Sequence, residues 1–599
     1  MKYTIKDFLE VKASGAPSFS PDGQYICFKS NSTGTSQIYL VQTIGENSTP
    51  VQITHFADSV SFASFSPTKN EIVFAKDIGG NEQMQLFVYS LETKEIRQLT
   101  NNTYVRHNFG RFSQDGNYIY YGCNERNGTD MDVYRMNLAT TETELVYSGS
   151  GSHNCVGVSK DDKTIVIRKS SSNVNNDLFL CNLETKEIEH ITPHSGDECY
   201  GTAVWIKGDS GFFVVTNKDT DFFNLSFYNI AEKKFIQAKK SEWDVDGFSI
   251  SYDSEYIALI VNEDGYNRFS LFNIKDLNNP ITTPIPQTSS VESIAFSKDS
   301  KYIAVSIHNS THTTDVWLYS IEANTLRQIT NSHQGVPPSE LVEPELIRYK
   351  SFDGLTIPSF LYKPKTIETD KKLPVIINIH GGPEGQSQPT LALLTQYFVY
   401  QGYAVLTPNV RGSTGYGKTY LSLDDVKKRM DSVKDIVSLH EHIKNNLPEL
   451  DSEKIILFGG SYGGFMVLAG LAFYPQLWAG GVDIVGISNF VTFLENTAAY
   501  RRAIREAEYG SLEKDRDFLE KISPSNHADK IKAPLFIIHG ANDPRVPLSE
   551  TEQMVQKIKA NNGIVELLVY EDEGHGLSKL KNRLDAYPKV VEFINRIVK

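Results

Sequence analysis

The segment IILFGGSYGGFMV, residues 455–467, places one serine, Ser461, among four glycines between two apolar runs. A buried strand that turns sharply into a helix can hold a serine hydroxyl exposed at the turn, an arrangement known as a nucleophile elbow. Strain at this turn and the close approach of strand and helix favour neighbours without side chains. Gly459, Gly463 and Gly464 meet this need. Ser461 is therefore a candidate nucleophile if a base, an acid and an oxyanion site accompany it.

Two later loops supply the acid and the base. LFIIHGANDPRVP places Asp543 just after a predicted strand, and LLVYEDEGHGL places His575 just after the next one. His575 would accept the Ser461 proton during attack, and Asp543 would fix the tautomer of His575 and stabilise its imidazolium form. Asp543 alone could cap the following helix, and His575 alone could be structural. Together, in the chain order typical of α/β-hydrolases, the three predict a catalytic triad.

An oxyanion hole should accompany such a triad. One donor would be the backbone N–H of the residue after the nucleophile, Tyr462, and the other would come from a glycine loop that follows an earlier strand. The segment NIHGGPEG offers this loop, with Gly381 and Gly382 as candidate donors. The loop could be a tight turn only, but its position after a predicted strand favours a role in catalysis as well.

The second half of the chain reads as an α/β domain. After SHQGVPPSELVEPE, near residue 335, buried-strand patterns alternate with helical patterns such as DSVKDIVSLHEHIKNNL. This alternation predicts a doubly wound, mostly parallel sheet, and ligands bind such sheets beyond the carboxyl ends of the strands. We expect an α/β-hydrolase catalytic domain over residues 336–599. The strand candidates are LPVIINIHGG, YAVLTPN, KIILFGG, GGVDIVG, APLFIIHG and VELLVYED.

The first half repeats itself seven times. Equivalent apolar positions recur at intervals of 45 to 47 residues, and each copy contains four short strand patterns. A constant period of this length with four strands per copy predicts a seven-bladed β-propeller over residues 12–335. A β-sandwich with irregular turns would not keep the spacing so constant. Residues 1–11 are expected as an N-terminal segment that could pack on the hydrolase. The equivalent positions are Phe19, Phe65, Phe112, Val158, Trp205, Ile250 and Phe296.

Composition narrows the functional class. The net charge of −14 without any basic block argues against nucleic-acid binding, and no apolar run approaches the roughly 20 residues of a membrane span. The first residues show no signal-peptide pattern, so a cytoplasmic location is expected. The five cysteines have no C-x-x-C spacing and are expected to be reduced and structural. No metal or cofactor is expected.

The whole chain resembles the prolyl oligopeptidase family of serine peptidases, and more narrowly its acylaminoacyl-peptidase-like branch. The segments that carry the resemblance are HGGP, NVRGSTGYG, GGSYGG, DPRVP and EGHG, which follow the repeats in that order. The resemblance implies that Ser461, Asp543 and His575 form the triad and that the N–H groups of Gly382 and Tyr462 form the oxyanion hole.

The resemblance also implies a role for Arg545, whose family counterpart hydrogen-bonds a substrate backbone carbonyl; a solvated surface charge is the alternative. Other branches place a tyrosine where this chain has His380, so a tyrosine hydroxyl donor is not expected there. Val410 departs from the tyrosine that the family often has at its position, which leaves no role for that side chain. The runs YRRAIREAEYG and SNFVTFLEN are candidate pocket walls, although they could equally belong to the core. In the second run, the apolar residues Phe490, Val491 and Phe493 could line a P1 pocket.

The leading hypothesis is a serine peptidase that hydrolyses short peptides through an acyl-enzyme, with the propeller excluding folded proteins. It could be an acylaminoacyl peptidase, an oligopeptidase or a carboxypeptidase-like trimmer. Dipeptidyl peptidases of similar sequence hold the substrate amine with a Glu-Glu pair, and no Glu-Glu dipeptide occurs in this chain. A carboxylesterase would use the same triad without needing a propeller, and a non-catalytic scaffold would not need the triad. The sequence leaves homo-oligomer formation open.

Overall fold

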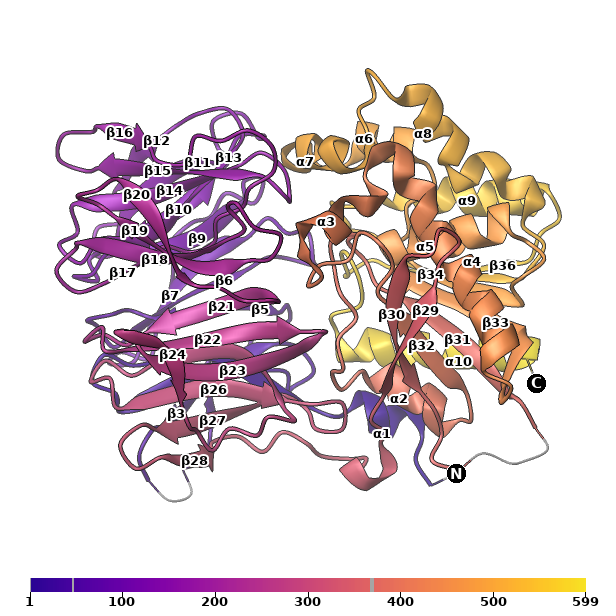
Figure 1. The fold of residues 1–599 in the computed structure, drawn as a ribbon, viewed down its shortest axis with the longest axis horizontal. Coiled ribbons are helices and arrows are strands. Elements are labelled where there is room, and N and C mark those ends of the chain that lie inside the picture. The colour runs from indigo at the N-terminus through magenta and orange to yellow at the C-terminus, as the bar shows by residue number, and fades with distance from the viewer. Residues whose placement is uncertain (1, 46–47, 367–370, 599) are drawn as a thin grey trace.

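The structure is a computed structural model that describes residues 2–45, 48–366 and 371–598. It contains two domains that face each other (Figure 1). The N-terminal part of the chain forms a β-propeller, drawn in indigo to magenta, and the C-terminal part forms an α/β domain, drawn in orange and yellow. The architecture predicted from the sequence, a seven-bladed β-propeller followed by an α/β-hydrolase domain, is confirmed.

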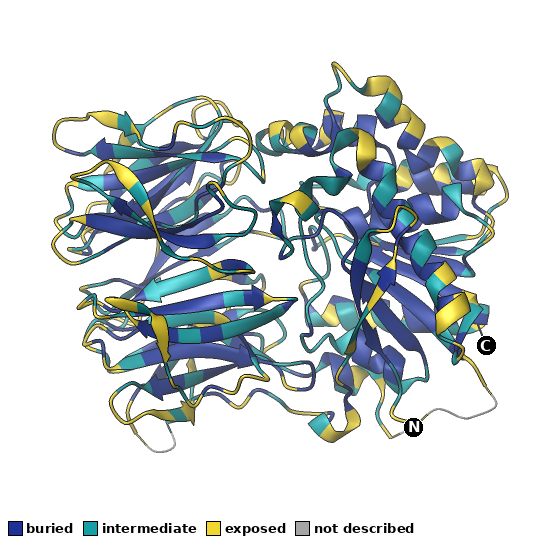
Figure 2. Ribbon diagram, in the orientation of Figure 1, coloured by how far each residue is buried: buried dark blue, intermediate teal, exposed yellow. Residues whose placement is uncertain are grey.

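Each propeller blade is a four-stranded antiparallel sheet whose strands pair in chain order. The middle strands are the most buried, and the fourth strands lie at the exposed outer rim (Figure 2). The strands are β1 (Ser14–Phe19), β2 (Tyr25–Ser30), β3 (Gln37–Gln42), β4 (Val51–Gln52), β5 (Val60–Phe65), β6 (Glu71–Lys76), β7 (Gln85–Ser90), β8 (Ile96–Gln98), β9 (His107–Phe112), β10 (Tyr118–Cys123), β11 (Asp132–Asn137), β12 (Thr143–Tyr147), β13 (Ser152–Val158), β14 (Thr164–Ser170), β15 (Asn176–Asn182), β16 (Ile188–His190), β17 (Val204–Trp205), β18 (Gly211–Thr216), β19 (Asn224–Asn229), β20 (Lys234–Lys239), β21 (Asp244–Ile250), β22 (Tyr256–Glu263), β23 (Tyr266–Asn273), β24 (Asp276–Ile281), β25 (Ser290–Phe296), β26 (Tyr302–His308), β27 (Asp315–Ser320) and β28 (Thr325–Gln328).

The ring closes between the first and the last blade by packing rather than by a shared strand. All four strands of each blade come from one continuous segment, and a single apolar cluster joins residues of blades one and seven. The backbone N–H of Ser14 also donates to the carbonyl of Thr314 at 2.8 Å. Closure of the propeller therefore depends on the same kind of contact that joins its other blades.

The α/β domain is built on one eight-stranded sheet in the order β29-β30-β32-β31-β33-β34-β35-β36. The pairs from β32 to β36 are parallel, and β29 and β30 add an antiparallel edge. The strands are β29 (Glu345–Lys350), β30 (Thr356–Tyr362), β31 (Leu373–Ile379), β32 (Ala404–Pro408), β33 (Leu450–Gly460), β34 (Gly480–Ile484), β35 (Leu535–Gly540) and β36 (Val565–Tyr570). The helices are α2 (Leu393–Tyr400), α3 (Gly417–Leu421), α4 (Arg429–Asn446), α5 (Tyr462–Phe473), α6 (Phe490–Asn496), α7 (Ala499–Tyr509), α8 (Arg516–Ile522), α9 (Leu548–Ala560) and α10 (Leu580–Val598), with short 3-10 turns at Pro338–Glu340, Ser422–Asp424, Val426–Lys428 and Pro524–Lys530.

Apolar side chains cover both faces of this sheet. One cluster joins the sheet to α4, α5, α6 and α9, and the other joins it to α2 and α10. The N-terminal helix α1 (Ile5–Leu9) belongs to the second cluster, because the ring of Phe8 packs on that of Tyr397 at 5.3 Å. The N-terminal segment thus lies on the α/β domain and not on the propeller that it precedes. None of the described helices is long and apolar enough to cross a membrane.

Candidate active site

Ser461 lies at the turn between β33 and α5. Its backbone adopts φ 59° and ψ −119°, a left-handed conformation that is costly for a residue with a side chain. The turn is held in place because the Ser461 N–H donates to the carbonyl of Ile484 at 2.8 Å. This strained turn between strand and helix is the backbone conformation that the sequence predicts for a nucleophile elbow.

The glycines around Ser461 differ in how much the fold needs them. A Cβ atom added at Gly459, Gly463 or Gly464 would lie less than 3.0 Å from neighbouring atoms, and at Gly463 the nearest atom is the carbonyl oxygen of Ile379. A Cβ at Gly460 would find no atom closer than 3.6 Å. Three of the four glycines therefore permit the close packing of α5 on the sheet, and Gly460 does not contribute to it.

Asp543 and His575 form a hydrogen-bonded pair. They lie on the loops after β35 and β36, and His575 Nδ1 is 2.6 Å from Asp543 Oδ2. The other carboxylate oxygen of Asp543 accepts the backbone N–H groups of Arg545 at 2.8 Å and Val546 at 3.1 Å. Asp543 does not cap the next helix, because Pro547 holds the N-cap position of α9. With Nδ1 donating to the carboxylate, Nε2 of His575 is left to act as a base.

The Ser461 hydroxyl makes no hydrogen bond to another residue within the described parts of the chain, so the third contact of a triad is not formed here. Catalytic hydrogen bonds often tighten only when a substrate is bound. The glycine loop after β31 lies directly beside the serine, because a Cβ added at Gly381 would be 3.2 Å from Ser461 Cβ. The elbow and the glycine loop therefore share one side of the site.

The two predicted oxyanion donors have free N–H groups. Neither Gly382 nor Tyr462 donates its backbone N–H to an acceptor among the residues that the structure describes. The carbonyl of Gly382 is anchored instead, because Arg505 Nη1 and the Tyr509 hydroxyl both donate to it at 3.3 Å. This anchoring holds the Gly382–Pro383 peptide group, which directly follows the candidate donor N–H.

A buried charged network supports the oxyanion side of the site, and nothing in the sequence pointed to it. The guanidinium of Arg429, at the start of α4, donates to Asp424 and Glu508. It also packs against the ring of Tyr462 at 5.1 Å and that of Tyr509 at 4.9 Å. Arg429 thus links Tyr462, a predicted oxyanion donor, to Tyr509, which anchors the carbonyl of Gly382.

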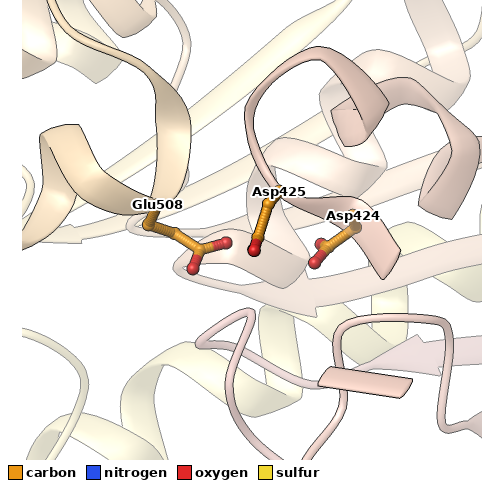
Figure 3. A group of neighbouring side chains, drawn as sticks. All are labelled: Asp424, Asp425 and Glu508. Atoms are coloured by element: carbon orange, nitrogen blue, oxygen red, sulfur yellow. The ribbon is translucent and has the colours of Figure 1, made fainter. Parts of the chain in front are cut away.

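The carboxylates around Arg429 resemble a metal site in their spacing. Asp424, Asp425 and Glu508 lie together, with ligand atoms within 4.8 Å of one another (Figure 3). Burial raises the pKa of Asp424 to about 7, although the Arg429 charge opposes this. Because the guanidinium already donates to two of the three carboxylates, Arg429 supplies the positive charge that a cation would otherwise bring.

Arg545 is turned toward the propeller. Its side chain is 42% exposed and forms an ion pair with Glu82, which lies just before β7. Glu82 also accepts from Arg106 at 3.1 Å. Burial alone would raise the pKa of Glu82, but the charges of Arg545 and Arg106 outweigh it and lower the pKa. Glu82 belongs to the site although the sequence gives no motif that would have identified it.

The propeller loop that carries Glu82 rests on the loops of the acid and the base. Asn542, beside Asp543, donates to the carbonyl of Gly79 at 3.1 Å. The backbone of Gly80 packs so closely on Gly574, beside His575, that a Cβ at either glycine would clash with the other. The pair of Asp543 and His575 is therefore placed at the interface between the two domains.

The proposed P1-pocket residues lie in the packed core. Phe490, Val491 and Phe493 are buried on α6, and both phenylalanines pack on the ring of Tyr509. No described cavity is lined by them. The structure therefore gives them the core position that the sequence left open as the alternative.

The two positions that depart from related branches are also structural. His380 is partly buried, desolvation lowers its pKa, and its Nε2 lies 2.9 Å from Ser413 Oγ. Val410 is buried in the apolar cluster on the α4 side of the sheet. Neither side chain has the tyrosine hydroxyl that could reach an oxyanion.

Comparisons with known proteins give a consistent picture. Residues 389–599 match the model of the prolyl oligopeptidase family, and residues 16–203 match that of the TolB β-propeller domain. The chain is 24% identical to dipeptidyl aminopeptidase BIII of Pseudoxanthomonas mexicana, over 94% of this chain and 84% of that protein. Its fold matches a puromycin-hydrolysing peptidase of Mycobacterium tuberculosis with a TM-score of 0.87 and 15% identity, over 100% of this chain and 96% of that chain. The uncomplexed acylaminoacyl peptidase of Pyrococcus horikoshii matches with a TM-score of 0.75 and 18% identity, over 100% of this chain and 98% of that chain.

Proposed function

The hydrolase domain of this chain belongs to the prolyl oligopeptidase family of serine peptidases, and from that premise we propose that Ser461, Asp543 and His575 form its catalytic triad. The observation that carries the proposal is the 2.6 Å contact of His575 with Asp543, on loops that follow adjacent parallel strands. The strained elbow at Ser461 lies on the same sheet and at the same ends of its strands. This is the arrangement that acyl transfer to a serine requires.

The reaction would proceed through an acyl-enzyme. Ser461 Oγ attacks the scissile carbonyl while His575 Nε2 takes its proton, and Asp543 stabilises the imidazolium that forms. The backbone N–H groups of Gly382 and Tyr462 bind the negative oxygen of the tetrahedral intermediate. His575 then protonates the leaving amine and activates the water that releases the acyl group.

The propeller would limit the substrates to short peptides. Its loops contact the hydrolase at several separate points, including Asn542 with Gly79, Tyr500 with Arg106 and Thr419 with Asp221. A folded protein could not pass between domains joined in this way. Peptides of a few to a few tens of residues should be cut, whereas a native globular protein should survive. Cleavage of such a protein at the rate of the peptides would refute the size limit.

Among the family's peptidase modes, the site favours an acylaminoacyl peptidase or an oligopeptidase over a dipeptidyl aminopeptidase. Binding of a substrate amine requires a free carboxylate. Glu82 reaches the site from the propeller, but its carboxylate already accepts the guanidinium groups of Arg545 and Arg106. We also propose a cytoplasmic location, which the five buried free thiols suit, since reduced cysteines are the rule in that compartment.

The test is labelling with a fluorophosphonate, which reacts with an activated serine. Ser461→Ala should abolish labelling and lower peptide turnover by a factor of order 10⁶. Ser438→Ala, on helix α4, should retain both and serves as the control. If the Ser461→Ala protein still labels at full stoichiometry, another residue is the nucleophile.

A further inference from the structure

A cavity lies between the propeller and helix α7, beside the proposed oxyanion loop. Its volume of about 170 Å³ is well above the ~10–15 Å³ that one water needs. Figure 1 shows α7 on the side of the hydrolase domain that faces the propeller. The polar residues that line the cavity are Arg106, Asn108, Ser152, Asn173, Tyr500, Arg501 and Arg505. The lining thus contains three arginines and no acidic residue.

Two of the lining arginines connect the cavity to the proposed reacting centre. Arg505 lines it and also donates to the carbonyl of Gly382 in the oxyanion loop at 3.3 Å. Arg106 lines it and binds Glu82, which in turn pairs with Arg545. A peptide with its scissile carbonyl at Ser461 would therefore place a neighbouring group close to this cavity.

Arg501 is the arginine whose charge is left without a partner. Its Nε is buried without a hydrogen bond, and its guanidinium forms no ion pair within the described parts of the chain. The neighbouring arginines are paired: Arg106 and Arg545 with Glu82, and Arg505 with Glu384. Burial lowers the pKa of Arg501, and the charges of Arg545 and Arg505 lower it further, although the nearby Glu82 carboxylate opposes them without pairing with Arg501.

A partly buried guanidinium with an unpaired Nε costs free energy, which a bound anion would offset. A guanidinium can bind both oxygens of a carboxylate through parallel hydrogen bonds. The amide of Asn108 and the hydroxyl of Tyr500 line the same cavity and can donate to the remaining lone pairs, whereas the amide of Asn173 already donates to Glu384. The cavity therefore has the donors that a carboxylate requires.

We propose that this cavity is a specificity subsite for a carboxylate of the peptide substrate, with Arg501 as its principal ligand. The proposal rests on the peptidase function proposed above. The carboxylate could be the C-terminus of a short peptide or an acidic side chain next to the scissile bond. In either case the enzyme selects peptides that carry a negative charge close to the bond that it cleaves.

Three peptides of one sequence distinguish these sources. The first ends in a free carboxylate shortly after the scissile bond, the second ends in an amide, and the third is the amide with glutamate in place of glutamine beside the scissile bond. In the wild type, kcat/KM for one or both charged peptides should exceed that for the neutral amide by roughly 10- to 150-fold, the effect of a hydrogen bond to a charged group. Preference for the free acid alone would identify C-terminal recognition, and preference for glutamate alone would identify an acidic side chain.

The variant Arg501→Gln should reduce this preference to nearly one while changing kcat/KM for the neutral amide little. The control is Arg502→Gln, since Arg502 is the next residue on α7 but is 44% exposed and pairs with Glu506. Arg502→Gln should keep the wild-type preference. Equal turnover of all three peptides by the wild type would overturn the proposal, and so would equal losses on all three in Arg501→Gln.

Two measurements keep the test decisive. If Arg501→Gln does not fold, competitive inhibition of the wild type by short peptide acids and by their amides gives the answer, and equal inhibition overturns the proposal. Fluorophosphonate labelling of Ser461 needs no carboxylate and reports the triad separately. Normal labelling without a charge preference refutes only the subsite, whereas absent labelling of the wild type refutes the peptidase mechanism itself.

Discussion

The propeller and the hydrolase domain differ in how their structures depend on single residues. In five blades the same turn recurs, in which a serine hydroxyl donates to an aspartate two residues later at 2.5–2.7 Å. The hydrolase domain instead has one serine elbow, one glycine loop beside it and one buried arginine network, and none of them is repeated. A repeated fold spreads its stability over equivalent small contributions, whereas the hydrolase concentrates its function in a few positions.

The largest effect is expected from a glycine that the elbow requires. Gly463→Ala places a methyl group against the carbonyl of Ile379, and backbone atoms at that distance cannot yield without moving α5 from the sheet. We expect a loss of at least about 3 kcal/mol in the free energy of unfolding and loss of fluorophosphonate labelling. Urea unfolding and the rate of labelling would measure the two effects.

The control for this prediction lies three residues earlier. Gly460→Ala meets no atom closer than 3.6 Å and should change stability by less than about 1 kcal/mol. Equal behaviour of the two variants would show that the glycines of the elbow are not needed for close packing.

The next effect contrasts two aspartates with opposite pKa shifts. Burial raises the pKa of Asp483 on β34 from its ordinary value to about 7. Burial of Asp115, in a propeller turn, is outweighed by hydrogen bonds from Ser113 and Asn117, which lower its pKa. The folded hydrolase therefore holds the Asp483 proton over a range where the unfolded chain has lost it, and its stability falls as the pH rises from about 4 to about 7.

Asp483→Asn should remove this pH dependence. Relative to the wild type, the variant should be nearly neutral at pH 4 and more stable by about 2–4 kcal/mol at pH 8. The measurement is a urea titration at several pH values, in which the loss of fluorophosphonate labelling at Ser461 reports the unfolding of the hydrolase domain. Asp115→Asn should have the opposite sign, because its stabilising charge is present at neutral pH and lost as the pH falls. A constant difference for Asp483→Asn across this range would contradict the raised pKa.

The third effect concerns Arg545, where the two domains meet. A guanidinium can hydrogen-bond a peptide carbonyl that runs past the triad, so Arg545→Ala should lower kcat/KM for peptides about 10- to 150-fold. A simple ester such as p-nitrophenyl acetate has no second carbonyl and should change little. Equal losses on both substrates would mean that Arg545 and its Glu82 contact support the Asp543 loop structurally. No loss on either would mean that Arg545 is a surface charge.

The sequence predicted the features that depend on local or regularly spaced residues. The elbow is specified by glycines next to Ser461, and the propeller by a period that each blade repeats. Glu82 and Arg429 were missed because they contact residues that are distant in the chain: Glu82 meets Arg545 across more than 460 residues, and Arg429 meets Glu508 across 79. No short pattern signals such a contact.

The predicted P1-pocket wall shows a second limit of what sequence can predict. The predicted wall consists of Phe490, Val491 and Phe493. These side chains are apolar, and apolar side chains suit a pocket wall and a core equally well. Only the packing of α6 against Tyr509 places them inside the domain. Sequence could thus predict candidate reacting groups, but not the charges and packed surfaces around them.

The smallest effect is expected in a propeller turn, at Ser297 between β25 and β26. Its hydroxyl donates to Asp299 at 2.6 Å and accepts the backbone N–H of Tyr302 at 2.9 Å. Ser297→Ala should therefore cost about 1–2 kcal/mol of propeller stability, by urea unfolding, and leave kcat/KM for a short peptide unchanged. The chain itself already contains a turn of this weaker kind. In the second blade, the residue two positions after Ser66 is Thr68 and not an aspartate. The Ser66 hydroxyl accepts only long N–H contacts from Thr68 and Lys69, at 3.4 and 3.3 Å, yet the blade is complete. Loss of peptidase activity in Ser297→Ala would show that a single blade turn controls the site, and the contrast between a distributed propeller and a concentrated hydrolase would fail.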